Sequence, residues 1–107
     1  MERLLEFAES IGAKVKYKPI VECFGLVDVS NGNIKIALSD KMTEEKAKYT
    51  LAHELAHLYL HEGKGNIIES PLYYEYEEQA DRGAKMLLDF MAMQESSVSV
   101  WKLSDLR

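Results

Sequence analysis

The feature that most constrains this chain is the run His-Glu-Leu-Ala-His at residues 53–57. On an α-helix, side chains four residues apart lie on one face, so the imidazoles of His53 and His57 can coordinate a single metal ion. Glu54 follows the first histidine directly and can reach a water molecule bound to that ion. The sequence therefore predicts a metal site on a helix, with Glu54 as the catalytic residue.

A catalytic zinc ion usually has three protein ligands and one open position, so the motif needs a third ligand. One class of HExxH enzymes uses a histidine six residues after the second one, but Gly63 occupies that position here. We expect Glu77 on a following helix to be the third ligand, because Asp81 lies one turn further on the same face and can accept the free ring N–H of a ligating histidine. Glu75 and Glu78 are predicted to lie on a solvated face.

His61 continues the four-residue spacing of the motif. It is a poor third ligand because helical geometry rotates it about 80° away from His53. We expect it to act as a charge that is favourable at the C-terminal end of the helix. Peptide hydrolysis also needs a hydrogen-bond donor for the oxyanion. The candidates are Tyr73, Tyr74, Tyr76, His61 and Arg82.

Hydrophobic periodicity and turn residues predict an α+β fold with a small antiparallel or mixed three-stranded sheet. The expected elements are a helix at 2–11, strands at 13–18, 21–29 and 34–38, helices at 43–61 and 71–90, and a short helix from Ser99 to Leu106. Asn31-Gly32 favours a two-residue hairpin turn between the last two strands. The strand at 34–38 is predicted to be a free edge to which an extended peptide could add.

Length and composition limit the domain organisation and the partners. A chain of 107 residues with 47% hydrophobic residues is expected to form a single domain over residues 1–107. Its net charge of −5 disfavours direct binding to nucleic acid. We expect no membrane span and no signal peptide, and hence a cytoplasmic protein. The single cysteine, Cys23, is predicted to be a buried structural thiol.

Two segments resemble the ImmA/IrrE-type metallopeptidases, gluzincins of bacteria, phages and mobile elements. The segment KYTLAHELAHLYLH at 48–61 resembles the signature helix of that family, and EEQADRGAKMLL at 77–88 resembles its E-x-x-A-N/D-x-F-A-x-x-L-L segment. The resemblance covers most of residues 1–90. It implies a minimal zincin-like domain with an active-site helix and a following ligand helix.

Matched position by position, the resemblance implies that His53, His57 and Glu77 bind Zn²⁺ and that Glu54 is catalytic. It implies that Asp81 lies next to a metal ligand and contacts that ligand instead of the metal. The chain departs from the family pattern at Gly83, where phenylalanine is usual, and at Asp89-Phe90, which replaces a common Met-Pro. A glycine here costs the helix about 1 kcal/mol unless it permits close packing.

The function predicted from these features is zinc-dependent endopeptidase activity, in which a metal-activated water hydrolyses a peptide bond. The substrate would be a protein or peptide, and the resemblance suggests a DNA-binding repressor as one candidate. The alternative is a zincin-fold binding module, similar to an antirepressor or to a toxin–antitoxin partner, that grips a regulatory protein without cutting it. A third alternative is a helical adaptor without metal, in which the two histidines lie on an ordinary amphipathic surface.

Overall fold

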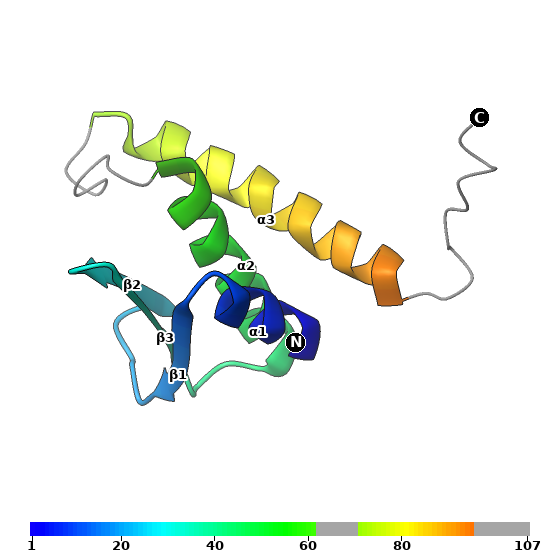
Figure 1. Ribbon diagram of the computed structural model, residues 1–107. Helices are drawn as coiled ribbons and strands as arrows, with labels where there is room; N and C mark the ends of the chain where they lie inside the picture. Colours follow the sequence, from blue (N-terminus) through cyan, green and yellow to red (C-terminus); the bar gives the residue numbers. More distant parts are fainter. Residues whose placement is uncertain (62–70, 96–107) are drawn as a thin grey trace.

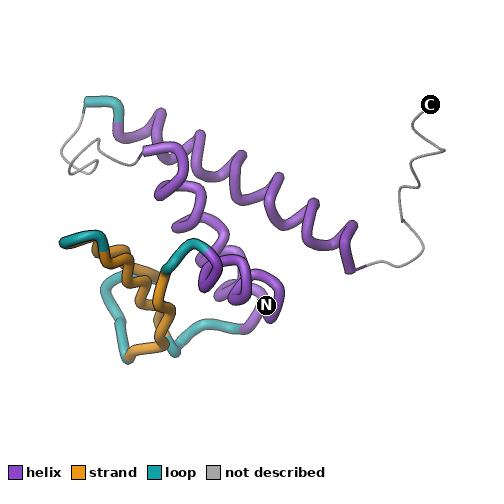
Figure 2. Tube along the Cα trace, in the orientation of Figure 1, coloured by secondary structure: helices purple, strands orange, loops and turns teal. Residues whose placement is uncertain are grey.

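The computed structural model describes residues 1–61 and 71–95, and its elements are shown in Figures 1 and 2. They are α1 (Glu2–Ser10), β1 (Ala13–Lys18), β2 (Gly25–Ser30), β3 (Asn33–Ser39), α2 (Glu44–His61) and α3 (Tyr73–Glu95). The predicted α+β fold class is confirmed. The helix α3 begins two residues later and ends five residues later than expected, and the short helix predicted from Ser99 lies outside the described residues.

The three strands form one mixed sheet with the order β1-β3-β2. Strand β1 pairs with β3 in parallel, and β2 pairs with β3 in antiparallel orientation, so that Ile36 faces Val15 on one side and Val27 on the other. The prediction that residues 34–38 form a free edge is therefore wrong. Among the described residues, the free edges belong to β1 and β2.

The central position of β3 has a physical cause in its side chains. Ile36 and Leu38 are 2% and 0% exposed, and both belong to the hydrophobic core. A strand with neighbours on both sides gains most from such residues, because both its edges and one face are removed from water. The hairpin signal correctly predicted that β2 and β3 are neighbours, but it carries no information about the side on which β1 adds.

The hairpin turn between β2 and β3 has the predicted residues in the predicted conformation. Asn31 and Gly32 have φ angles of 53° and 79°. Both angles are positive, as a two-residue turn that follows the twist of the strands requires.

Helix α2 lies between the sheet and α3, as Figure 1 shows. Its start is capped as expected, because the backbone N–H of Lys46 donates to the hydroxyl of Thr43 at 3.2 Å. Leu51 and Leu55 are buried in the same core as Leu38 of the sheet and Leu4 of α1. Because α2 packs against the rest of the domain along much of its length, the face that carries the histidines is held in a defined orientation.

The position of Cys23 differs from what the sequence indicated. Cys23 is half-buried and precedes β2, and its thiol lies 3.5 Å from the carbonyl oxygen of Gly25. The thiol is thus less buried than the sequence indicated, and Cys23 lies before the strand in which it was expected.

In the ranges 1–61 and 71–95, no helix combines the length and apolar character that crossing a membrane requires.

Gly83 permits close packing of α3 against α2. A Cβ atom added at Gly83 would lie 3.0 Å from Cβ of Ala56 and 3.5 Å from Cδ1 of Leu60. The first contact is too tight for ordinary packing, and the Ala56 methyl group cannot rotate away because it is attached directly to the backbone. The phenylalanine that is usual at this position in the family would not fit the helix spacing observed here.

We expect Gly83→Ala to destabilise the protein by about 1 kcal/mol, because overpacking of 1–3 kcal/mol exceeds the gain in helix propensity of about 1 kcal/mol. Urea unfolding of the wild type, of G83A, of A56G and of the double variant would measure the effect. The double variant exchanges the two small residues, so it should be more stable than the sum of the two single changes predicts. Additive effects, or a G83A variant more stable than wild type, would show that the helices have room to spare.

Candidate metal centre

The facing sides of α2 and α3 bring three side chains to one point. Nε2 of His53 lies 2.8 Å from Oε2 of Glu77 and 3.0 Å from Nε2 of His57. Nε2 of His57 lies 3.2 Å from the same Glu77 oxygen. These are the three residues that the sequence predicted as metal ligands. Each points one potential ligand atom towards the other two, so the cluster could hold a metal ion.

The size of this triangle fits a small tetrahedral metal ion. Zinc binds histidine nitrogen and carboxylate oxygen at about 2.0–2.2 Å, so two ligand atoms at the tetrahedral angle are about 3.3 Å apart. The three distances of 2.8–3.2 Å are only slightly shorter than this value. Two histidines and one glutamate also form a known donor set of catalytic zinc, and they leave a fourth position open.

Burial favours the neutral imidazole that a metal ligand needs. Side chains of His53 and His57 are 16% and 12% exposed. Desolvation lowers the pKa of His57, although the nearby Glu77 carboxylate opposes this effect. Metal binding requires deprotonated histidine nitrogen, so the environment of His57 reduces the competition from protons.

Glu54 follows His53 directly in the sequence, and it is half-buried in the structure. Burial raises the pKa of its carboxyl group, the charge of His53 lowers it, and Glu77 adds to the increase. A carboxylate with a raised pKa binds a proton more readily than one in water. Such a group is suited to accept a proton and later to release it.

Asp81 and Tyr49 stand behind His53. Nδ1 of His53 lies 2.9 Å from Oδ1 of Asp81, close enough for an ion pair although it is not aligned as a hydrogen bond. The hydroxyl of Tyr49 donates to the same Asp81 oxygen at 2.6 Å, and this hydrogen bond raises the pKa of Tyr49 to about 12. The sequence suggested Asp81 for this position but missed Tyr49, although Tyr49 precedes His53 by four residues on the same helix face.

The environment of His61 differs from the one that the sequence suggested. His61 was expected to act only through the C-terminal end of α2, but it is 6% exposed and packs beside the cluster. Its Nδ1 lies 2.9 Å from Nδ1 of His57, and its Nε2 lies 2.8 Å from Oε1 of Gln79. Gln79 received no role from the sequence. Its spacing gave no signal, since Gln79 follows Glu77 by two residues and side chains two apart on a helix do not share a face.

The neighbouring acids of α3 face other directions. Glu78 forms an ion pair with Arg82 one turn later, and the two side chains are 63% and 76% exposed. Glu75 is also exposed. Both glutamates thus occupy the solvated positions that the sequence predicted for them.

The same contacts reduce the choice of an oxyanion donor. Arg82 is paired with Glu78, and Tyr74 is 85% exposed. The ring of Tyr76 lies against His61, with ring centroids 4.5 Å apart. Tyr73 lies within the electrostatic influence of Glu77, which raises the pKa of its hydroxyl. A hydrogen bond to the Glu77 carboxylate contributes to this increase, so the hydroxyl of Tyr73 is linked to a residue of the cluster.

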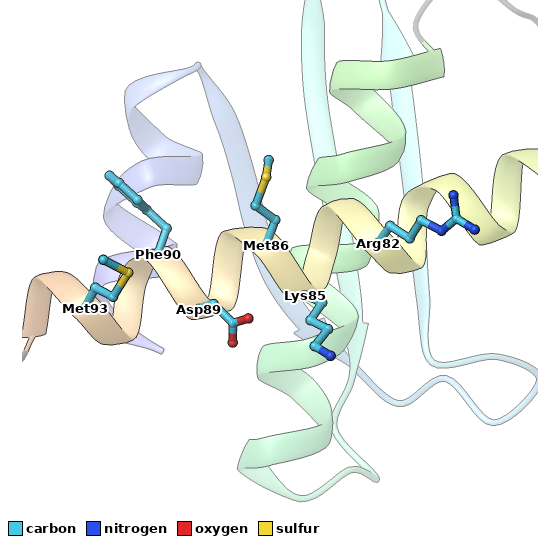
Figure 3. Close-up of a pocket in the computed structure, with 6 residues that line it drawn as sticks. All are labelled: Arg82, Lys85, Met86, Asp89, Phe90 and Met93. Carbon is cyan, nitrogen blue, oxygen red and sulfur yellow. The ribbon is translucent and has the colours of Figure 1, made fainter.

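Two shallow hollows lie along α3, outside the cluster. One of about 410 Å³ is lined by Arg82, Lys85, Met86, Asp89, Phe90 and Met93, whose side chains are drawn in Figure 3. The other, of about 370 Å³, adjoins Tyr49 and Asp81. Neither is lined by a residue of the His53, His57 and Glu77 cluster.

The fold and the cluster define the class of this protein. A small α+β domain in which an HExxH helix faces a glutamate on the next long helix is a zincin-like arrangement. A family model described as the IrrE N-terminal-like domain, of peptidase family M78, matches residues 8–88, and the chain belongs to this family. This confirms the resemblance to ImmA/IrrE-type proteins. No protein with curated annotation and no solved structure shows a significant match.

Proposed function

We propose that the protein is a zinc-dependent endopeptidase, with His53, His57 and Glu77 as the metal ligands and Glu54 as the catalytic residue. The observation that carries this proposal is the triangle of ligand atoms, whose separations of 2.8–3.2 Å suit a tetrahedral ion. Membership of a peptidase family supports the same activity.

Zinc at this site would lower the pKa of a bound water molecule towards neutrality and polarise the substrate carbonyl. Glu54 would be the residue that accepts a proton from the attacking water and later delivers it to the leaving amine, a double role suited to its raised pKa. Asp81 holds the ring of His53, and Tyr49 holds Asp81.

The substrate that fits this site is an extended segment of a protein. Within residues 1–61 and 71–95, strand β2 has a free edge and contacts α2, and the two approach so closely that a Cβ added at Gly25 would lie 2.9 Å from Cγ2 of Thr50. A peptide added to this edge would form backbone hydrogen bonds and run along the helix that carries His53. Strand β2 thus replaces residues 34–38 as the proposed docking edge.

We further propose that the partner is a regulatory protein, with a DNA-binding repressor as the candidate, and that the protein acts in the cytoplasm without binding nucleic acid or membrane itself. The net charge of −5 supports this choice, because it repels phosphate groups. A basic protein surface would be attracted to the same charge. Incubation of the zinc-loaded protein with the product of a neighbouring regulatory gene would test this choice, and cleavage or complex formation is the expected result.

The metal itself gives the first test of this function. The purified protein should bind one equivalent of zinc, and free zinc at about 100 times the Kd should stabilise it by about 2.7 kcal/mol. For a domain of this size this corresponds to an increase in Tm of roughly 10 °C, which a chelator should reverse. Elemental analysis and thermal unfolding with and without chelator measure both effects. Less than about a tenth of an equivalent after zinc loading would exclude the metallopeptidase function.

A further inference from the structure

We propose that His61 and Gln79 form a positioning relay for His57. In this relay Nδ1 of His61 accepts a hydrogen bond from Nδ1–H of His57, and Nε2–H of His61 donates a hydrogen bond to Oε1 of Gln79. The proposal rests on the metal site proposed above and assigns it two further residues. His61 is the last residue of α2 and Gln79 lies on α3, the two helices that carry the cluster.

The geometry shows an unbroken chain of three contacts. Nε2 of His57 faces the ligand triangle, 3.0 Å from Nε2 of His53. On the other side of the ring, Nδ1 of His57 lies 2.9 Å from Nδ1 of His61. Nε2 of His61 then lies 2.8 Å from Oε1 of Gln79. All three distances are in the range of hydrogen bonds.

Only one arrangement of protons satisfies the chain when Nε2 of His57 binds a metal. A ligating nitrogen has no proton, so the neutral ring of His57 carries its proton on Nδ1 and donates it to His61. Nδ1 of His61 must then be the acceptor, which places the proton of His61 on Nε2. Oε1 of Gln79 is an acceptor and receives it. The direction of both hydrogen bonds is therefore set by the metal at one end of the relay and by the amide oxygen of Gln79 at the other.

The burial of His61 requires such partners. The residue is 6% exposed, and the ring of Tyr76 lies against it with centroids 4.5 Å apart. A buried imidazole with two unsatisfied nitrogens would be costly, whereas here each nitrogen has a partner. The two ligating histidines thus have different supports, a carboxylate for His53 and a neutral relay for His57. The relay fixes the ring of His57 without adding a charge to the site.

Variants of Gln79 give the clearest test, because this side chain is exposed and its replacement does not threaten the fold. Gln79→Met keeps the length but removes the acceptor, and it should weaken zinc binding about threefold, the effect of one neutral hydrogen bond. Gln79→Glu keeps an acceptor oxygen and should bind zinc at least as tightly as wild type. Equal zinc affinity of Q79M, Q79E and wild type, measured by chelator competition, would overturn the relay.

Variants of His61 test the inner contact. His61→Phe retains a ring but leaves the N–H of His57 without an acceptor, so zinc affinity should fall about tenfold or more. His61→Asn places an amide oxygen near the position of Nδ1 and should restore most of that loss. If the two variants lose affinity equally, His61 is a packing residue and the relay is wrong.

Nitrogen NMR of the zinc-loaded wild type reads the proton positions directly. His57 should carry its proton on Nδ1 and His61 on Nε2, and Gln79→Met should shift the His61 resonances. A proton on Nδ1 of His61 would overturn the relay even if zinc binds normally. A wild type that binds no zinc would instead remove the metal centre and the relay with it. The failure of the proposed function is thus distinguishable from failure of the relay alone.

Discussion

Glu54→Gln is expected to reduce peptide-bond hydrolysis by at least about 100-fold while leaving zinc content and Tm unchanged, because the amide keeps the shape of the side chain but cannot accept a proton. Burial is the largest cause of the raised pKa of Glu54. The neutral amide therefore avoids the desolvation of a charge and should not harm the fold. Cleavage of the partner protein, zinc analysis and thermal unfolding measure the three quantities.

Glu45→Gln provides the matched control for this experiment. Glu45 is an exposed residue in the first turn of the same helix, so its replacement removes the same charge without touching the site. It should retain full activity. If E54Q cleaves as fast as E45Q, Glu54 is not the base. If E54Q loses cleavage but keeps its biological effect, the protein acts as the binding module that the sequence left open as the alternative.

Glu77→Ala is expected to weaken zinc binding at least tenfold, the largest effect that we predict for any residue of α3. The change removes the oxygen that lies 2.8 Å from His53 and 3.2 Å from His57, so two nitrogens would be left to hold the ion. Competition with a chromophoric chelator measures the affinity. Asp81→Ala should have a smaller effect, because Asp81 contacts Nδ1 of His53 and none of the three ligand atoms.

Glu78→Ala is the control for this comparison, since Glu78 is the next residue and has the same charge. Its carboxylate pairs with Arg82 in solvent, so we expect zinc affinity within about twofold of wild type. A Glu78 variant that loses the metal while the Glu77 variant retains it would contradict both the helix phase in the structure and the assignment by family resemblance.

Much of the site could be predicted because helical spacing acts over short distances. The spacing of four between His53 and His57, together with the helix start at Thr43, placed both imidazoles on one face before any tertiary contact was known. Glu77 and Asp81 followed from the same rule on the next helix. The family assignment rests on these local segments, and the match over residues 8–88 bears it out.

The residues that the sequence missed act across helices. Tyr49 reaches Asp81 on α3, and His61 of α2 reaches Gln79 of α3. Each partner is an ordinary residue of an amphipathic helix when it is considered alone. Only the separation and rotation of the two helices decide which side chains meet. That separation depends in part on Gly83, which lies directly against Ala56.

The sequence by itself determined the local elements, the hairpin turn at Asn31-Gly32 and the helical spacing of His53 and His57, because periodicity, capping and turn conformation depend on residues close in the chain. The tertiary structure decided the strand order and the partners of His57 and His53. Strand β1 lies beside β3 because β3 gains most from having a neighbouring strand at each edge. That gain depends on contacts between segments far apart in the sequence. The support of the ligands likewise depends on the packing of α2 against α3, which no single segment encodes.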